Sequence, residues 1–154
     1  MPENIAFNHV GQCVSDLSRS RRFYEELLEF TFEREMKLPD EPSKRLLRIE
    51  PPIGMTAVYL RRDGLVLELL HFDRAGNPPA RERVMNEPGL THVSIGVEDT
   101  ASLLSRVAGY GGEVLSDTDI GGGVVFIRDP DGQLIELLPM SYRTALDREA
   151  AEGA

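Results

Sequence analysis

The sequence predicts an α+β fold made of two βαβββ modules, and three observations predict it. Residues 7–10 and 90–93 are similar tetrapeptides that lie 83 residues apart. Residues 63–70 and 131–138 are similar octapeptides that lie 68 residues apart. Within each copy the pattern runs strand, helix and then further strands. Self-similarity at a long offset is typical of a duplicated structural unit.

Module one spans residues 5–72. It begins with a predicted strand at 7–14, and Asp16 is expected to cap a helix because apolar residues then recur at helical spacing. Asp63-Gly64 is a strong signal for a tight hairpin turn. Strand character follows the helix in three runs, 31–36, 56–61 and 65–72.

Module two spans residues 90–140 and repeats the same order of events. A predicted strand at 90–97 precedes Asp99 as the helix cap, and Gly111-Gly112 ends the helix. Asp129-Pro130-Asp131-Gly132 predicts a turn. Its strand-like runs are 113–115, 124–128 and 134–138.

The two offsets differ by 15 residues, so module one carries an insertion between its helix and its last strand. We assign it to the proline-rich stretch 38–54 and expect a long loop, in which residues 46–49 cover a site. Residues 73–89 are the expected linker, and 141–154 an expected tail. At 154 residues the chain corresponds to one domain, with its two modules paired sheet beside sheet.

Composition excludes several function classes. The net charge of −9 would repel a nucleic acid. Cys13 is the only cysteine, which rules out an internal disulfide and a four-thiolate metal site. The apolar runs are far shorter than the ~20 residues that span a bilayer, and the start does not read as a signal peptide. We therefore expect a cytoplasmic protein that does not bind membranes.

Four polar residues recur at equivalent places in the two modules. His9 and His92 lie in the first strand of each copy, and Glu68 and Glu136 in the otherwise apolar last strand. An ionised carboxylate in a buried strand needs a partner. Strand alternation directs the four side chains toward one point, where a divalent cation would balance the two carboxylates. The alternative is that each His–Glu pair only satisfies the core.

Nitrogen and oxygen donors without thiolate suit zinc, nickel, cobalt, manganese or ferrous iron. Four protein ligands leave two positions open on an octahedral ion. Two adjacent open positions suit a small-molecule substrate that chelates through neighbouring oxygens.

These motifs make the sequence resemble the vicinal oxygen chelate superfamily, which contains glyoxalase I, methylmalonyl-CoA epimerase, extradiol dioxygenases and bleomycin-resistance proteins. The resemblance implies a cupped, barrel-like mixed sheet with helices outside, a homodimer, and one divalent metal ion held by His9, Glu68, His92 and Glu136. The motifs that carry it are Asn8-His9-Val10, residues 14–17, Arg22-Phe23-Tyr24, Leu67-Glu68-Leu69, residues 90–93 and residues 129–137.

The His/Glu/His/Glu set implies a metal-dependent lyase or isomerase that moves a proton next to a carbonyl through a metal-bound enediolate. Glu136 is the preferred base, with Glu68 as the other candidate. Two alternatives stay open. One is a resistance-type protein that binds a small molecule such as an antibiotic. The other is an Fe(II) extradiol-type dioxygenase, although such enzymes carry histidine where this chain has Glu68.

Some residues depart from the pattern or have simpler interpretations. Bacterial glyoxalase I has glutathione-binding arginine and asparagine where this chain has Cys13 and Phe72, so another thiol, an acyl or keto substrate, or an epimerase is favoured. We expect Cys13 to be a small buried residue and His71 to face away from Glu68. Three arginines are candidate contacts for an anionic substrate tail: Arg48, Arg61 and Arg62.

Overall fold

The computed structural model describes residues 4–143, 147 and 152. The chain divides into two compact units, Met1–Pro79 and Ala80–Ala154, and the division falls within the expected linker 73–89. Each unit holds one four-stranded mixed sheet, which confirms the α+β class and the two βαβββ modules. Most of the expected tail 141–154 lies outside the described residues.

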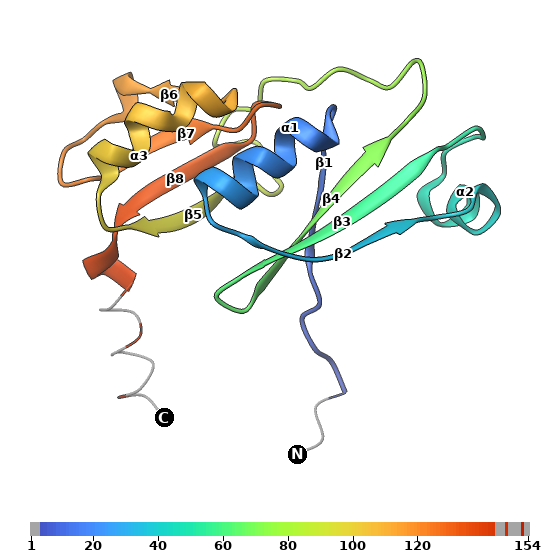
Figure 1. Cartoon of the computed structure of the whole chain (residues 1–154), viewed down its shortest axis with the longest axis horizontal. Helices are drawn as coiled ribbons and strands as arrows, with labels where there is room; N and C mark the ends of the chain where they lie inside the picture. The colour runs from blue at the N-terminus through green and yellow to red at the C-terminus, as the bar shows by residue number, and fades with distance from the viewer. Residues whose placement is uncertain (1–3, 144–146, 148–151, 153–154) are drawn as a thin grey trace. The chain divides into compact units, whose positions relative to one another are not determined.

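The sheet of unit one has the strand order β1-β4-β3-β2, with β1 parallel to β4 and the other pairs antiparallel (Figure 1). The strand β1 is shorter than the predicted 7–14, so His9 immediately precedes it. The elements are β1 (Val10–Cys13), α1 (Leu17–Arg22), the π-helical turn η1 (Phe23–Leu27), β2 (Thr31–Lys37), α2 (Asp40–Leu47), β3 (Met55–Arg62) and β4 (Leu65–Phe72).

Local sequence explains two of these elements. The Asp16 carboxylate accepts a hydrogen bond from the Arg19 N–H at 2.9 Å, which satisfies one of the unpaired donors at the start of α1. Asp63 and Gly64 both have positive φ, at 46° and 80°, as the two central residues of a tight hairpin turn require. This turn fixes the register of β3 on β4, with Arg62 opposite Leu65.

The two faces of this sheet bury different groups. Helix α1 contacts β4, and the side chains of Phe23, Tyr24 and Leu27 are fully buried. On the face that carries Glu68, a second apolar cluster is centred on β3. It consists of Ile53, Met55, Ala57 and Tyr59, with Leu38, Leu47, Ile49, Val66, Leu70 and Phe72 packed against it.

The insertion is not the loop that we expected, because residues 40–47 form helix α2. In Figure 1 this helix lies beside the last residues of β2 and the first residues of β3. Asp40 and Glu41 lie in its first turn, where carboxylates favour the helix dipole. Arg48 ends the helix in the left-handed conformation, with φ of 57°. Of the residues expected to cover a site, Leu47 and Ile49 pack on the apolar cluster, whereas Leu46 is 83% exposed and covers nothing.

Unit two repeats the topology, with strand order β5-β8-β7-β6 and β5 parallel to β8. The Asp99 carboxylate accepts a hydrogen bond from the Ser102 N–H at 2.9 Å and so caps α3, as Asp16 caps α1 in unit one. Gly111, which was predicted to end the helix, follows the short turn η2 after α3 and is left-handed, with φ of 80°. The elements are β5 (His92–Val97), α3 (Thr100–Val107), η2 (Ala108–Tyr110), β6 (Glu113–Leu115), η3 (Ser116–Thr118), β7 (Val125–Arg128) and β8 (Leu134–Pro139). None of the helices in the described residues has the length and apolar character needed to span a membrane.

Candidate functional site

In unit one the structure brings together His9 and Glu68. Glu68 lies in β4 opposite Gly11 of β1, and its Oε2 is 3.1 Å from Nε2 of His9. The other ring nitrogen, Nδ1, is 2.5 Å from the Oδ1 of Asn8. A partner on one ring nitrogen orients the imidazole and directs the second nitrogen. Here the second nitrogen points at the carboxylate.

Tyr59 holds the second oxygen of Glu68. It lies opposite Glu68 in the β3–β4 register, and its hydroxyl donates to Oε1 at 2.6 Å. Burial raises the pKa of Tyr59 above the ordinary tyrosine value, and the hydrogen bond and charge of Glu68 raise it further. The phenol therefore stays protonated as a donor. Its ring also meets the His9 ring edge to face, with centroids 5.5 Å apart.

In unit two the structure brings together the equivalent residues, His92 and Glu136. The Nε2 of His92 is 3.6 Å from Oε2 of Glu136, and its Nδ1 is 2.8 Å from the Thr91 hydroxyl. Ser94 donates its hydroxyl to the same Oε2 at 2.8 Å. The place of Tyr59 is taken by Phe126, which lies opposite Glu136 and packs edge to face on His92 at 5.4 Å.

The two glutamates are held differently. Glu68 has a partner on each carboxylate oxygen, and 11% of its side chain is exposed. Both partners of Glu136 are on Oε2, and 24% of its side chain is exposed. Within residues 4–143 no protein donor contacts its Oε1. The Glu136 carboxylate thus has more freedom to move than that of Glu68.

The donor atoms within each pair suit a metal ion. Nitrogen and oxygen ligands bind at about 2.0–2.2 Å, so two neighbouring ligands on one ion lie roughly 3.0–3.5 Å apart. The observed separations of 3.1 Å and 3.6 Å are close to this range. In the described part of the chain, no three His, Cys, Asp or Glu side chains gather to hold an ion. The geometry is therefore established pair by pair, one pair in each unit.

A pocket of about 370 Å³ adjoins the pair in unit one. It touches the pair through Asn8, which contacts His9, and through Tyr59, which contacts Glu68. Two arginines, Arg34 and Arg61, lie on its wall. Its complete lining is Phe7, Asn8, Glu33, Arg34, Tyr59, Arg61, Gly64 and Val66.

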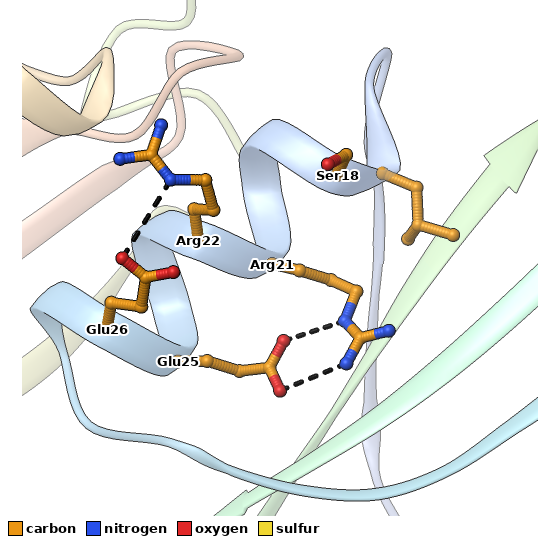
Figure 2. A pocket seen from close by; sticks show the side chains of 6 residues that line it. Ser18, Arg21, Arg22, Glu25 and Glu26 are labelled. Carbon is orange, nitrogen blue, oxygen red and sulfur yellow. Dashed lines mark hydrogen bonds and ion pairs between the residues drawn. The ribbon is translucent and has the colours of Figure 1, made fainter.

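A larger hollow of about 600 Å³ lies along helix α1 and its continuation, and Figure 2 shows it. Its charged side chains pair with one another, Arg21 with Glu25 at 2.7 Å and Arg22 with Glu26 at 3.8 Å. It contains no histidine, and an open surface lined by one helix encloses a ligand poorly. We therefore place the candidate site at the smaller pocket.

The other residues singled out from the sequence lie apart from the pairs or beside them. Cys13 is exposed, which overturns the expectation of a buried residue. His71 pairs with Thr56 in the sheet, on the alternate face of β4 from Glu68. Of the three arginines, only Arg61 lines the pocket, because Arg62 binds Glu29 and Arg48 ends helix α2.

Sequence reasoning missed Tyr59 and Arg34. A signal for Tyr59 existed, because a two-residue turn at Asp63-Gly64 pairs residue 62 with 65 and hence 59 with 68. The repeat does not single out Tyr59, because the equivalent residue in the second copy is Phe126. Arg34 had no comparable signal, since it lies in β2 beyond a register shift between Phe32 and Arg34.

Known proteins resemble the chain over most of its length. It is 28% identical over 141 residues to the lactoylglutathione lyase GLX1 of Arabidopsis thaliana. The matched region is 88% of this chain but only 44% of that protein. The chain thus spans less than half of this curated relative.

Two solved structures share the fold. The trypanothione-dependent glyoxalase I of Leishmania major is 26% identical, with a TM-score of 0.66 and coverage of 95% of this chain and 96% of that one. A mutant of the fosfomycin resistance protein FosX of Listeria monocytogenes, complexed with Mn(II) and 1S,2S-dihydroxypropylphosphonic acid, is 15% identical, with a TM-score of 0.62 and coverage of 90% and 97%.

A family model matches residues 6–137, which include both His–Glu pairs. The chain therefore belongs to the Glyoxalase/Bleomycin resistance protein/Dioxygenase superfamily.

Proposed function

We propose that the protein is a divalent-metal-dependent lyase or isomerase that moves a proton at a carbon next to a carbonyl group. His9, Glu68, His92 and Glu136 would hold one metal ion. When bound, the metal supplies a Lewis acid that polarises the substrate's neighbouring oxygens. The observation that carries the proposal is the recurrence, in both modules, of an imidazole nitrogen and a carboxylate oxygen at metal-ligand spacing.

The structure supports different roles for the two glutamates. Tyr59 and His9 restrain both oxygens of Glu68, which suits a fixed ligand. Glu136 keeps one oxygen without a protein donor among the described residues, which suits a base that takes a proton and returns it. Ser94 steadies the other oxygen of Glu136 during this transfer.

The imidazole orientation is also built into the fold. Asn8 and Thr91 contact the Nδ1 atoms of His9 and His92 and leave the Nε2 atoms facing the carboxylates. A neutral imidazole with Nδ1 protonated offers its Nε2 lone pair to a metal. Both histidines are thus prepared as ligands in the same way.

The test compares metal-free and metal-loaded protein. Purified protein is stripped with EDTA, reloaded separately with Mn²⁺, Zn²⁺, Ni²⁺, Co²⁺ or Fe²⁺, and assayed for metal content and turnover. Substrates are methylglyoxal hemithioacetals of glutathione and trypanothione, and methylmalonyl-CoA, which separates a lactoylglutathione lyase-like from an epimerase-like activity. We expect turnover only with metal. Full activity in stripped protein would contradict the proposal, and failure to take up any metal would favour a small-molecule binding role.

Variants separate metal binding from proton transfer. His92→Ala and Glu136→Ala are expected to lose both bound metal and turnover. Glu136→Gln keeps an oxygen donor but cannot act as a base, so it should keep more metal while turnover falls by about 10²–10⁴-fold. His71→Ala is the matched control, because His71 lies on the other face of β4 and should retain metal and activity.

We also propose that the protein acts as a homodimer, and mixing variants tests where the site is assembled. His9→Ala and His92→Ala proteins are each inactive under the proposal. If the site uses residues of two chains, a mixture of the two variants regains part of the activity. If each chain builds its own site, the mixture stays inactive.

A further inference from the structure

We propose that Arg34, with Arg61 beside it, forms a binding site for an anionic group of the substrate, a carboxylate or a phosphate. This inference rests on the proposed function and specifies its substrate class. The site is the pocket of about 370 Å³ in unit one, which adjoins the His9–Glu68 pair. A substrate that binds there would place its negatively charged end on the arginines and its reacting end toward Glu68.

The charge of Arg34 is not neutralised by a neighbouring carboxylate. Among the described residues no Asp or Glu lies within ion-pair distance of its guanidinium. The neighbouring glutamates of β2 have other partners, since Glu33 binds Arg61 at 2.8 Å and Glu35 lies 3.7 Å from Arg21. In a chain with a net charge of −9, a cation without a counter-charge on a pocket wall is a specific attraction for an anion.

Arg34 is also oriented before any ligand arrives. Its guanidinium carbon lies 4.3 Å from the centre of the Tyr59 ring. The Tyr59 ring is buried and is itself fixed by the hydrogen bond to Glu68. Stacking on an aromatic face leaves the outer edge of the guanidinium available, and this planar edge matches two oxygens of a carboxylate or phosphate.

The sheet aligns this arginine with the candidate metal ligand. Arg34 lies opposite Tyr59, Tyr59 opposite Glu68, and Glu68 opposite Gly11, so the four residues form one row across β2, β3, β4 and β1. Neighbouring strands are about 4.8 Å apart, which separates the backbones of Arg34 and Glu68 by about 10 Å. Both side chains extend over the same face of the sheet, so the two ends of one small substrate can contact both.

Arg61 strengthens the same end of the pocket. It lines the pocket and is held by Glu33, so it contributes hydrogen-bond donors with part of its charge balanced. The opposite end of this sheet face carries the apolar cluster with α2. The face therefore has a basic end at Arg34 and Arg61, with Glu68 in the row of Arg34, and an apolar end at α2, which orients a substrate that is charged at one end only.

The first experiment uses two substrates that differ only in charge. Phenylglyoxal hemithioacetals of mercaptopropionate and of its neutral amide are assayed with metal-loaded wild-type protein, Arg34→Gln, Arg34→Lys and Arg22→Gln. We expect wild type to prefer the acid. Arg34→Gln should lower kcat/KM for the acid by about 10- to 100-fold, as expected for loss of a hydrogen-bonded charge, and leave the amide within about twofold. Arg34→Lys should retain part of the preference.

Arg22 provides the control for a change of net charge, because it lies in α1 outside the pocket and pairs with Glu26. Arg22→Gln should therefore behave as wild type. A preference for the acid that survives in Arg34→Gln would overturn the proposal, as would equal turnover of acid and amide by wild type.

A binding experiment separates this proposal from the proposed function. Metal-free protein is titrated with methylphosphonate and, separately, with propionate, while NMR follows the Arg34 side-chain Nε–H resonance where it is present and the backbone amide resonances of the pocket residues in every variant. A saturable shift in wild type and Arg22→Gln, with no saturable binding in Arg34→Gln, supports the site even if wild type turns over neither substrate. The two ligands show whether phosphate-like or carboxylate groups bind better. An Arg34 resonance that does not move with either ligand would refute the site whatever the catalytic result.

Discussion

Replacing Tyr59 with phenylalanine should destabilise the folded protein by removing one hydroxyl. The Tyr59 hydroxyl donates to Oε1 of Glu68 at 2.6 Å, and both residues are buried. A hydrogen bond to a charged group contributes about 1.5–3 kcal/mol, and its loss leaves a buried carboxylate oxygen without a donor. Phe126 packs on His92 at the equivalent place in unit two, so the fold accepts a phenylalanine ring at this position.

The structure offers two control substitutions of the same type. Tyr24→Phe removes a buried hydroxyl that donates to the neutral Gln12 side chain at 3.0 Å, so it should cost only about 0.5–1.5 kcal/mol. Tyr142→Phe changes a residue that is 56% exposed and should alter stability by less than about 0.5 kcal/mol. The expected order of destabilisation is thus Tyr59, then Tyr24, then Tyr142.

Urea unfolding of metal-free protein measures these differences without a contribution from bound ions. Thermal unfolding gives a second estimate, because about 2 kcal/mol corresponds to a Tm lowered by roughly 4–8 °C for a chain of this size. A Tyr59→Phe protein as stable as Tyr24→Phe would refute the reasoning, since the charge of Glu68 would then add nothing to the hydrogen bond.

Three further predictions concern the fold around the site. Asp16→Ala removes the cap of α1 and should lower the free energy of unfolding by about 1 kcal/mol in urea melts. Leu47→Ala should lower the free energy of unfolding by about 1 kcal/mol because Leu47 packs on the apolar cluster. Leu46→Ala, at an 83% exposed residue, should cause no measurable change. Equal changes in the two variants would argue against packing of α2 on the cluster. The pKa of Tyr59 is raised in the folded state, so its bound proton favours folding. This stabilisation is fully present at pH values below about 10, the ordinary tyrosine pKa, and is lost as the pH rises through the raised pKa. Wild type should therefore lose more stability than Tyr59→Phe above about pH 10 in chemical unfolding at a series of pH values.

Much of the fold could be predicted because the chain contains the same module twice. Each copy supports the interpretation of the other, so the short strand β6 was recognisable from its place after α3 and before a clearer strand. The helix α2 occurs in only one copy and had no such support. Its prolines suggested a loop, but Pro42 lies in the first helical turn, where a missing N–H costs no hydrogen bond.

The candidate site was predictable for the residues that the repeat preserves and not for those that differ. His9, Glu68, His92 and Glu136 stand out because a polar residue recurs at the same place in an apolar strand. Their unequal surroundings do not follow from the repeat. That inequality depends on Tyr59, whose partner in the other copy lacks a hydroxyl, and on the insertion that covers one sheet face only.

Strand β2 bears on how two copies of the chain can meet. It is the outer strand of its sheet, all seven of its residues are exposed, and Glu33, Arg34, Glu35 and Lys37 alternate in charge along it. A charged border of this kind discourages a second polypeptide from extending the sheet through main-chain hydrogen bonds. The opposite border, β1, carries no charged residue, and the same is true of β5 in unit two. Any dimer that forms by joining strands should therefore use these uncharged borders and leave Arg34 open to solvent.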